Sequence, residues 1–207
     1  MTSNGILNDA RVARVRELTA ALAEANARLV QAEAERNSLI AHLHVAVLAL
    51  HDLGQLPANV NLRIIDGWNA ILRGRNVSKL TAEDISSLKN EYLASLGIPP
   101  ASTSEPPHGS NAESPVTTWI VFDGPEENSC RSGQYRVTYT GGDGPHRADR
   151  LILDYVHAVK LLGLDTSRVV VETADKQLAK KLAAFGATVT PPPDRKSETL
   201  AQVCEGL

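Results

Sequence analysis

Cysteine, aromatic residues and long apolar runs are all scarce in this sequence. Two of its 207 residues are cysteine, and Phe, Trp and Tyr together make up 4%. Two cysteines are too few for a scaffold held together by disulfides. The longest apolar stretch, residues 43–50, contains His44 and falls short of the roughly 18 residues that a membrane-spanning helix needs. We therefore expect neither a disulfide-rich fold nor a chain that crosses a bilayer.

The amino terminus lacks the basic segment and apolar core that an export signal requires. This absence predicts a cytoplasmic protein, in which Cys130 and Cys204 are reduced thiols. The composition, 43% hydrophobic and 22% charged, is typical of one or two modest globular domains. With 21 Lys and Arg against 24 Asp and Glu, the net charge is −3, so a nucleic-acid partner would need a local basic patch.

Residues 8–54 are predicted to form one long helix, because no Pro or Gly lies between Gly5 and Gly54 and because Ala, Leu, Glu and Arg are abundant. Apolar residues recur along it in alternating steps of three and four, the pattern of a coiled-coil seam. The seam consists of Val15, Leu18, Leu22, Ala25, Leu29, Ala32, Leu39, Leu43, Ala46, Leu50 and Leu53, with Arg36 in the one position that is not apolar. A helix cannot bury this stripe against itself. We expect it to pair with a second copy of the chain, as a homodimer, or with a partner protein; packing on the globular part of the chain is the remaining alternative.

From residue 60 to residue 190, short β-branched runs alternate with helical stretches. The expected strands are residues 61–66, 117–123, 135–140, 168–173 and 187–190, and the expected helices are residues 81–96, 146–162 and 176–185. This alternation predicts an α/β fold with a mostly parallel sheet and helices on both of its faces. In such sheets, ligands bind at the carboxyl ends of the strands.

Two segments have too little apolar content to belong to the core. Residues 98–115 are rich in Pro, Ser and Glu, and we interpret them as a flexible surface insert, with a linker between two domains as the alternative. The elements on either side are too few for two separate cores. Residues 191–207 are expected to form a loosely packed carboxyl-terminal tail.

Four aspartates occur where predicted strands end or where the following helices begin: Asp66, Asp123, Asp149 and Asp175. Each one alone has an ordinary explanation, since an acidic residue at a strand end often caps the next helix. Together at one edge of a sheet they would repel one another unless protons or cations neutralised them. Carboxylate oxygens suit Mg²⁺ or Mn²⁺, which can bridge protein and phosphate groups. The pattern therefore favours metal-dependent hydrolysis of a phosphodiester.

Five short motifs accompany these aspartates. They are IIDGWNAIL at residues 64–72, VFDGP at 121–125, RADRLI at 147–152, VETADKQL at 171–178 and FGATV at 185–189. In this order, over residues 61–189, the sequence resembles the NYN domain of the PIN-like nuclease superfamily, and its YacP-like branch in particular. The resemblance implies a metal-dependent nuclease that favours RNA; the residues themselves do not separate RNA from DNA.

The resemblance also implies roles for individual residues. Asp66 and Asp149 would be the principal metal-binding carboxylates, and Asp175 would complete the acidic cluster. Asn69 would orient a ligand or the scissile phosphate, and Thr173 would form a hydrogen bond within the site. The candidate catalytic residues are therefore the three aspartates and Asn69.

Three further positions are less simply assigned. Asp123 matches another acidic position of the family and is a candidate metal ligand, although the Gly124-Pro125 that follows also explains it as a turn residue. Arg150 stands where many relatives carry a second acidic residue, and it would reduce the number of bound metals or contact a phosphate. His146 would act as an acid or a phosphate contact, but a surface histidine without a role is favoured.

Cationic side chains follow the same motifs and would hold the substrate's phosphates around the acidic centre. The candidates are Arg73, Arg75, Lys79, Arg147, Arg150, Lys176, Lys180 and Lys181, of which the last two are better explained as ordinary solvated residues of a helix. Trp68 would stack on an unpaired base or else lie buried under the sheet edge.

Together these features predict an endoribonuclease that uses Mg²⁺ or Mn²⁺ to activate water against single-stranded or structured RNA. That chemistry needs no nucleophilic Ser or Cys. The alternative is a catalytically inactive PIN-like module that binds RNA or a protein and is brought into a complex by its coiled coil. An inactive domain has no physical reason to retain mutually repelling carboxylates, which favours the nuclease.

Overall fold

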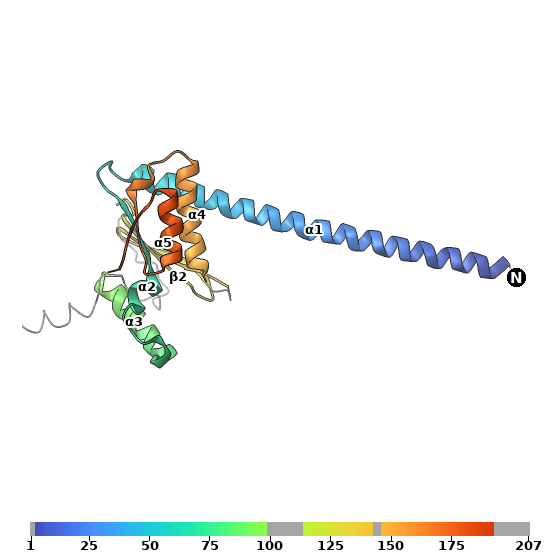
Figure 1. Ribbon diagram of the computed structural model, residues 1–207, viewed down its shortest axis with the longest axis horizontal. Helices are drawn as coiled ribbons and strands as arrows, with labels where there is room; N and C mark the ends of the chain where they lie inside the picture. The colour runs from blue at the N-terminus through green and yellow to red at the C-terminus, as the bar shows by residue number, and fades with distance from the viewer. Residues whose placement is uncertain (1–2, 99–113, 143–145, 193–207) are drawn as a thin grey trace, which may run out of the picture. The chain divides into compact units, whose positions relative to one another are not determined.

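The computed structural model describes residues 3–98, 114–142 and 146–192, with side chains from residue 11 onward (Figure 1). The helices are α1 (Ser3–Gln55), α2 (Gly67–Leu72), α3 (Ala82–Ser95), α4 (Arg147–Leu161) and α5 (Lys176–Phe185), with short 3-10 helices η1 (Val77–Lys79) and η2 (Thr166–Arg168). The strands are β1 (Leu62–Asp66), β2 (Thr118–Phe122), β3 (Glu127–Ser132), β4 (Tyr135–Thr140), β5 (Val169–Glu172) and β6 (Thr188–Thr190). The chain divides into two compact units between His44 and Val45.

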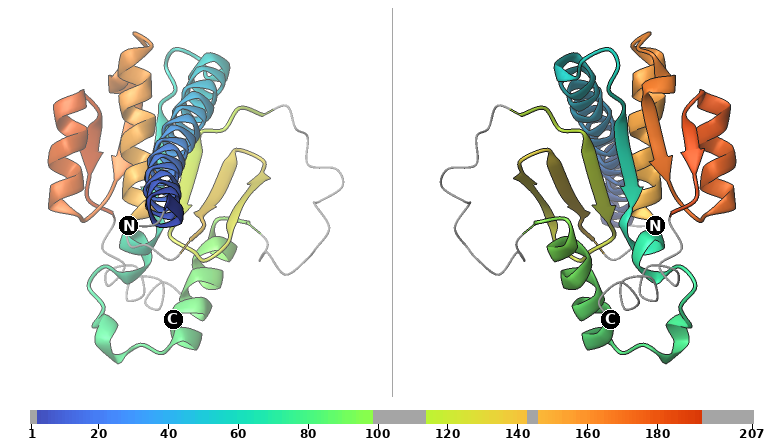
Figure 2. Two further views of the ribbon diagram at one scale, coloured as in Figure 1. Left: turned by 90° about the vertical axis from the view of Figure 1, so that its right-hand side faces the viewer. Right: turned by 90° about the vertical axis from the view of Figure 1, so that its left-hand side faces the viewer.

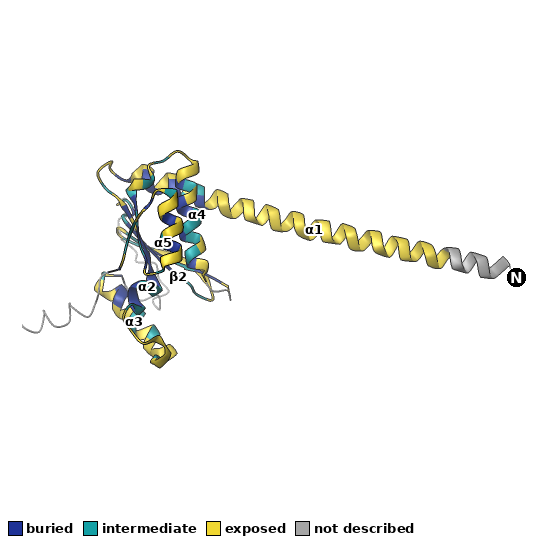
Figure 3. Cartoon of the chain, in the orientation of Figure 1, coloured by how far each residue is buried: buried dark blue, intermediate teal, exposed yellow. Residues whose placement is uncertain are grey.

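The first unit is the amino-terminal part of α1. A single continuous helix runs through it, as the absence of Pro and Gly predicts, and its side chains from residue 11 to residue 44 are exposed (Figure 3). The large apolar residues of the expected seam are each more than half exposed: Val15, Leu18, Leu22, Leu29, Leu39 and Leu43. The long helix is confirmed, whereas pairing of its seam with another helix stays a prediction.

The second unit is built on one six-stranded sheet. Its strand order is β3-β4-β2-β1-β5-β6, and every neighbouring pair is parallel except β3 and β4, which are antiparallel. At the centre, β1 pairs with β2 on one side and with β5 on the other, so that Ile65 lies between Ile120 and Glu172. The predicted α/β class with a mostly parallel sheet is confirmed.

Helices cover both faces of this sheet (Figure 2). On one face, the last turns of α1 pack with α4 and α5 around a core that includes Trp119 and Tyr155. On the other face, α2 and α3 cover a second core that includes Ile120 and Phe122. All five residues of β2 are buried because its side chains point alternately into the two cores, which explains its continuous apolar sequence.

An ion pair that is shielded from solvent fixes the last turns of α1 to the sheet. The Asp52 side chain is fully buried and accepts hydrogen bonds of 2.6 and 2.7 Å from the Arg136 guanidinium on β4. The Tyr155 hydroxyl of α4 donates to the same carboxylate at 3.4 Å. Leu53, the last position of the expected seam, lies in this core with an exposed fraction of 4%, so it is not available to a partner helix.

One strand and one α-helix of the sheet domain are absent from the sequence-based expectations. The polar hexapeptide ENSCRS forms β3, an edge strand whose composition gives no apolar alternation to detect. The six residues after Asp66 form α2, which is too short to show a helical period.

Residues 99–113 of the expected insert and residues 193–207 of the expected tail lie outside the described residues. In the part of the chain that is described, no helix combines the length and the apolar character needed to span a membrane.

Candidate metal centre

The acidic residues gather where the connections of the sheet change direction. From β1 the chain passes to β2 on one side, and from β5 it passes to β6 on the other, while β1 and β5 are neighbours. Ligands of open α/β sheets bind outside the carboxyl ends of the strands at such a switch point. Asp66 ends β1 and Thr173 directly follows β5, so both lie at this point of the sheet.

Asp66 is held in place by two neighbouring residues. It caps α2, where its Oδ1 accepts from the Asn69 backbone N–H at 3.3 Å. Its Oδ2 accepts from the Asn69 side-chain amide and from the Thr173 hydroxyl, the latter at 3.0 Å. Gly67 is required by close packing, since a Cβ there would collide with the Phe122 ring. Hydrogen bonding and close packing therefore account for the Asp, Gly and Asn of the Asp-Gly-Trp-Asn motif.

Burial raises the pKa of Asp66 above its ordinary value, because only 3% of the residue is exposed to solvent. The hydrogen bonds from Asn69 and Thr173 lower the pKa, and the negative charge of Asp149 raises it again. On balance the charged form of Asp66 is disfavoured in this environment. A cation bound nearby would favour it, because an opposite charge stabilises a carboxylate.

Asp175 occupies the corresponding place after β5. Its Oδ1 caps α5 by accepting from the backbone N–H groups of Gln177 and Leu178 at 2.6 and 3.1 Å. The Thr173 hydroxyl accepts from the Asp175 backbone N–H at 3.1 Å and donates to Asp66. One buried hydroxyl thus links the carboxylate at the end of β1 to the segment after β5.

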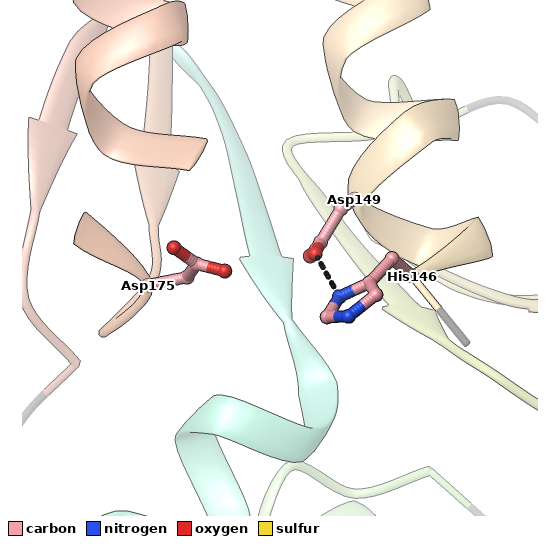
Figure 4. A group of neighbouring side chains, drawn as sticks. All are labelled: His146, Asp149 and Asp175. Atoms are coloured by element: carbon pink, nitrogen blue, oxygen red, sulfur yellow. Dashed lines mark hydrogen bonds and ion pairs between the residues drawn. The ribbon is translucent and has the colours of Figure 1, made fainter. Parts of the chain in front are cut away.

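Asp149 lies in the first turn of α4, and His146 lies directly before that helix (Figure 4). The His146 Nδ1 is 3.0 Å from Asp149 Oδ2, and Asp175 faces this pair from the start of α5. One potential ligand atom from each of the three residues lies within 4.8 Å of the other two. Side chains that could hold a metal ion therefore converge from the starts of two separate helices.

These three side chains line one pocket between α4 and α5, with a volume of about 490 Å³. The other residues that line it are Arg150, Leu153, Asp154, Gln177, Leu178 and Lys181. Arg150 and Lys181 are exposed, and each brings a positive charge from its helix to the pocket that contains the acidic group. Positive groups around a carboxylate centre are what a phosphodiester substrate requires.

The donor set fits a divalent cation after a small adjustment. Two ligands that each bind one Mg²⁺ at about 2.1 Å lie at most about 4.2 Å apart. The three donor atoms here lie within 4.8 Å of one another, and the His146 side chain is 75% exposed. The difference is below about 1 Å, and because none of the three side chains is buried, small rotations can close it. Carboxylate oxygens and an imidazole nitrogen are also the ligand types that divalent metals take.

Asp66, Asn69 and Thr173 lie outside the group of three, and so do two further predicted site residues, Asp123 and Trp68. Asp123 follows β2, and its Oδ1 accepts from the Ala148 backbone N–H at 2.6 Å and from the Thr140 hydroxyl at 3.3 Å. Trp68 donates its indole N–H to the Asp123 carbonyl at 2.9 Å and packs edge-on against Phe122. Asp123 therefore holds the start of α4, and Trp68 is tied to the end of β2. Their roles in metal or substrate binding stay predictions.

The predicted arginines divide in a similar way. Arg150 lines the pocket, whereas Arg73, Arg75 and Arg147 are not among its lining residues. The Arg147 guanidinium lies against Gly142 instead. Substrate binding by these three arginines stays a prediction.

The structure places in the pocket two residues that the sequence favours as ordinary surface residues, His146 and Lys181. His146 precedes Asp149 by three residues, a spacing that places two side chains side by side at the start of a helix, so a usable signal was present. Lys181 has no comparable signal, because its place in the pocket with Arg150 depends on how α5 packs against α4.

Comparisons with known proteins leave the family of this chain open. No protein-family model matches it, and no curated protein matches it. Among solved structures, it is similar to a crystal structure of a mutant of Rae1 (YacP) from Bacillus subtilis, with 16% sequence identity and a TM-score of 0.43. The match covers 71% of this chain and 80% of that one. Similarity at this level does not establish a family, so the function proposed below depends on the residues of this chain.

Proposed function

We propose that this chain is a divalent-metal-dependent endoribonuclease that hydrolyses phosphodiester bonds of single-stranded or structured RNA. The observation that carries the proposal is the convergence of His146, Asp149 and Asp175 in a pocket that also contains Arg150 and Lys181. RNA is preferred to DNA because the motif resemblance points to it; the pocket itself does not distinguish the two.

The carboxylates have different parts in this proposal. Asp149 and Asp175 hold Mg²⁺ or Mn²⁺, because their oxygens belong to the converging group. Asp66 adds a third carboxylate, whose pKa the charge of Asp149 helps to raise, and Asn69 and Thr173 keep it in position. Asp123 supports the centre by holding the turn of α4 that carries Asp149, and it remains a candidate for a further metal ligand.

The chemistry follows from these positions. When bound, a divalent ion makes water nucleophilic near neutral pH and offsets negative charge on the phosphate in the transition state. Arg150 and Lys181 hold phosphate oxygens at the rim of the pocket. Thr173 fixes the Asp66 carboxylate relative to the segment that carries Asp175. No Ser or Cys nucleophile takes part, and Cys130 lies away on the edge strand β3.

Conservative substitutions at Asp149 and Asp175 test the proposal. We expect Asp149→Asn and Asp175→Asn each to lower Mn²⁺-dependent cleavage of RNA by more than about 100-fold, since losing even an outer partner of a metal site costs about 10- to 100-fold. Asn keeps the size of the side chain, and at residue 175 it can still cap α5. The matched control is Asp165→Asn: Asp165 is exposed and caps η2, before the amino end of β5. This control should cleave at the wild-type rate.

The assay uses labelled RNA and DNA of the same sequence, in buffer cleared of metal by a chelator and then supplied with Mn²⁺ or Mg²⁺. Unchanged cleavage by both site variants would refute the assigned centre. A wild-type chain that binds RNA and cleaves nothing with either metal would support the alternative, an inactive PIN-like module that binds RNA or protein.

We also propose that the exposed seam of α1 binds a second copy of the chain or a helix of a partner protein. Six large apolar side chains of the seam, from Val15 to Leu43, are each more than half exposed, and their exposure supports this proposal. Full burial of one such side chain contributes about 1.5–3 kcal/mol before the entropy cost of association is subtracted. Pairing with a partner helix would therefore bury the seam at a gain in free energy.

A further inference from the structure

The candidate metal centre contains a histidine, His146, beside its two aspartates. His146 adds a nitrogen donor to a group that otherwise offers only carboxylate oxygens. We propose that His146 is a direct ligand of the bound ion and that it makes the centre prefer Mn²⁺ to Mg²⁺. The inference depends on the metal centre of the proposed nuclease. It assigns His146 as a third protein ligand, and it names the metal that this ligand favours.

The backbone positions His146 for this role. With φ 62° and ψ 25°, the residue lies in the left-handed region, which few residues other than glycine adopt. Among the described residues, no other non-glycine residue has a positive φ. The chain therefore turns sharply into α4 at this point, and the imidazole lies beside Asp149 rather than away from the pocket.

The carboxylates also leave a place for a third ligand. Asp175 uses its Oδ1 to cap α5, so its second oxygen is the one that can bind an ion. Across the pocket from Asp175, the Oδ2 of Asp149 lies 3.0 Å from the Nδ1 of His146. In the converging group, the donor besides these two carboxylates is the imidazole of His146.

The type of ligand atom determines which ion binds more tightly. Mg²⁺ is usually held by one or two carboxylates and keeps several of its waters, so Asp149 and Asp175 alone would make an ordinary Mg²⁺ site. An imidazole nitrogen is a softer ligand that suits first-row transition metals better than Mg²⁺. The His146 side chain is 75% exposed, so an ion entering from solvent can reach it.

Spectroscopy of the bound metal tests this directly, without a cleavage assay. In the full chain loaded with Mn²⁺, electron spin-echo modulation should show the ¹⁴N signal of a coordinated imidazole. His146→Asn should remove that signal while Mn²⁺ stays bound, since Asn tolerates the left-handed backbone at residue 146. The matched control is His44→Gln on the exposed part of α1, which should leave the signal unchanged.

Calorimetric titration with each metal gives a second readout. The ratio of the Mg²⁺ to the Mn²⁺ dissociation constant should fall by at least about 10-fold in His146→Asn. Mn²⁺ bound by the wild-type chain without a ¹⁴N signal, or an unchanged ratio in the variant, would overturn the role of His146 and leave the nuclease centre standing. Mn²⁺ binding that is absent, or that is indifferent to Asp149→Asn and Asp175→Asn, would overturn the centre itself.

Discussion

The buried pair of Asp52 and Arg136 predicts how strongly α1 is joined to the sheet domain. We expect Asp52→Asn to lower the free energy of unfolding of that domain by about 3–5 kcal/mol. The carboxylate is fully buried, its two bonds to the guanidinium are 2.6 and 2.7 Å long, and the Arg136 side chain is only 11% exposed. Without Asp52 the guanidinium keeps its charge where water hardly reaches it, and this unpaired charge causes most of the loss.

A second pair of the same kind supplies the matched control. Arg63 on β1 donates two hydrogen bonds of 2.6 and 2.8 Å to Glu172 on β5, but the Arg63 side chain is 45% exposed. Glu172→Gln removes the same charge, and water can then hydrate the freed guanidinium. We therefore expect this control to cost at most about 1 kcal/mol.

Urea denaturation in metal-free buffer measures both losses. Tryptophan fluorescence is a suitable probe, because the Trp119 ring packs edge-on against Tyr155 and lies under the Arg136 guanidinium. The double variant Asp52→Leu with Arg136→Met removes both charges and should recover most of the stability; it also keeps the test open if Asp52→Asn does not fold. Equal losses for Asp52→Asn and Glu172→Gln would refute the reasoning that burial gives the first pair its importance.

Two further predictions concern the seam of α1 and the charge of Asp66. If the seam pairs with a second copy, deleting residues 1–44, which leaves Val45 and Ala49 in the core, should reduce the mass measured by light scattering to that of one chain and preserve the circular dichroism of the sheet domain. The same number of chains per particle before and after would contradict pairing with a second copy. Because burial raises the folded-state pKa of Asp66, the stability that its proton contributes is present at low pH and is lost as the pH rises through that pKa. In metal-free buffer, the unfolding free energy of the wild type relative to Asp66→Asn should therefore decrease as the pH rises above 3.8, and a difference that does not change with pH would contradict the burial argument.

Much of the architecture follows from local patterns. The helix-forming composition of α1 and the apolar runs of β1, β2 and β5 depend on neighbours within a few residues, so they can be predicted. The edge on which Asp66 and Asp175 lie follows as well, because parallel strands place their carboxyl ends on the same side of a sheet.

What escapes prediction depends on packing between distant segments. Asp52 and Arg136 are 84 residues apart, and the sequence around either residue does not indicate that the two will form an ion pair. The strand β3 is polar because it lies at an edge, so its sequence resembles a loop. The approach of His146 to Asp175 requires α4 and α5 to begin side by side, which only the folded sheet brings about.

The sharpest test of the metal centre is anomalous X-ray scattering from crystals of the full chain grown with Mn²⁺. We expect a peak in the pocket between α4 and α5, bonded to carboxylate oxygens of both Asp149 and Asp175. A pocket without a peak, while Mn²⁺ is bound elsewhere on the chain, would contradict the proposed centre and the nuclease that depends on it.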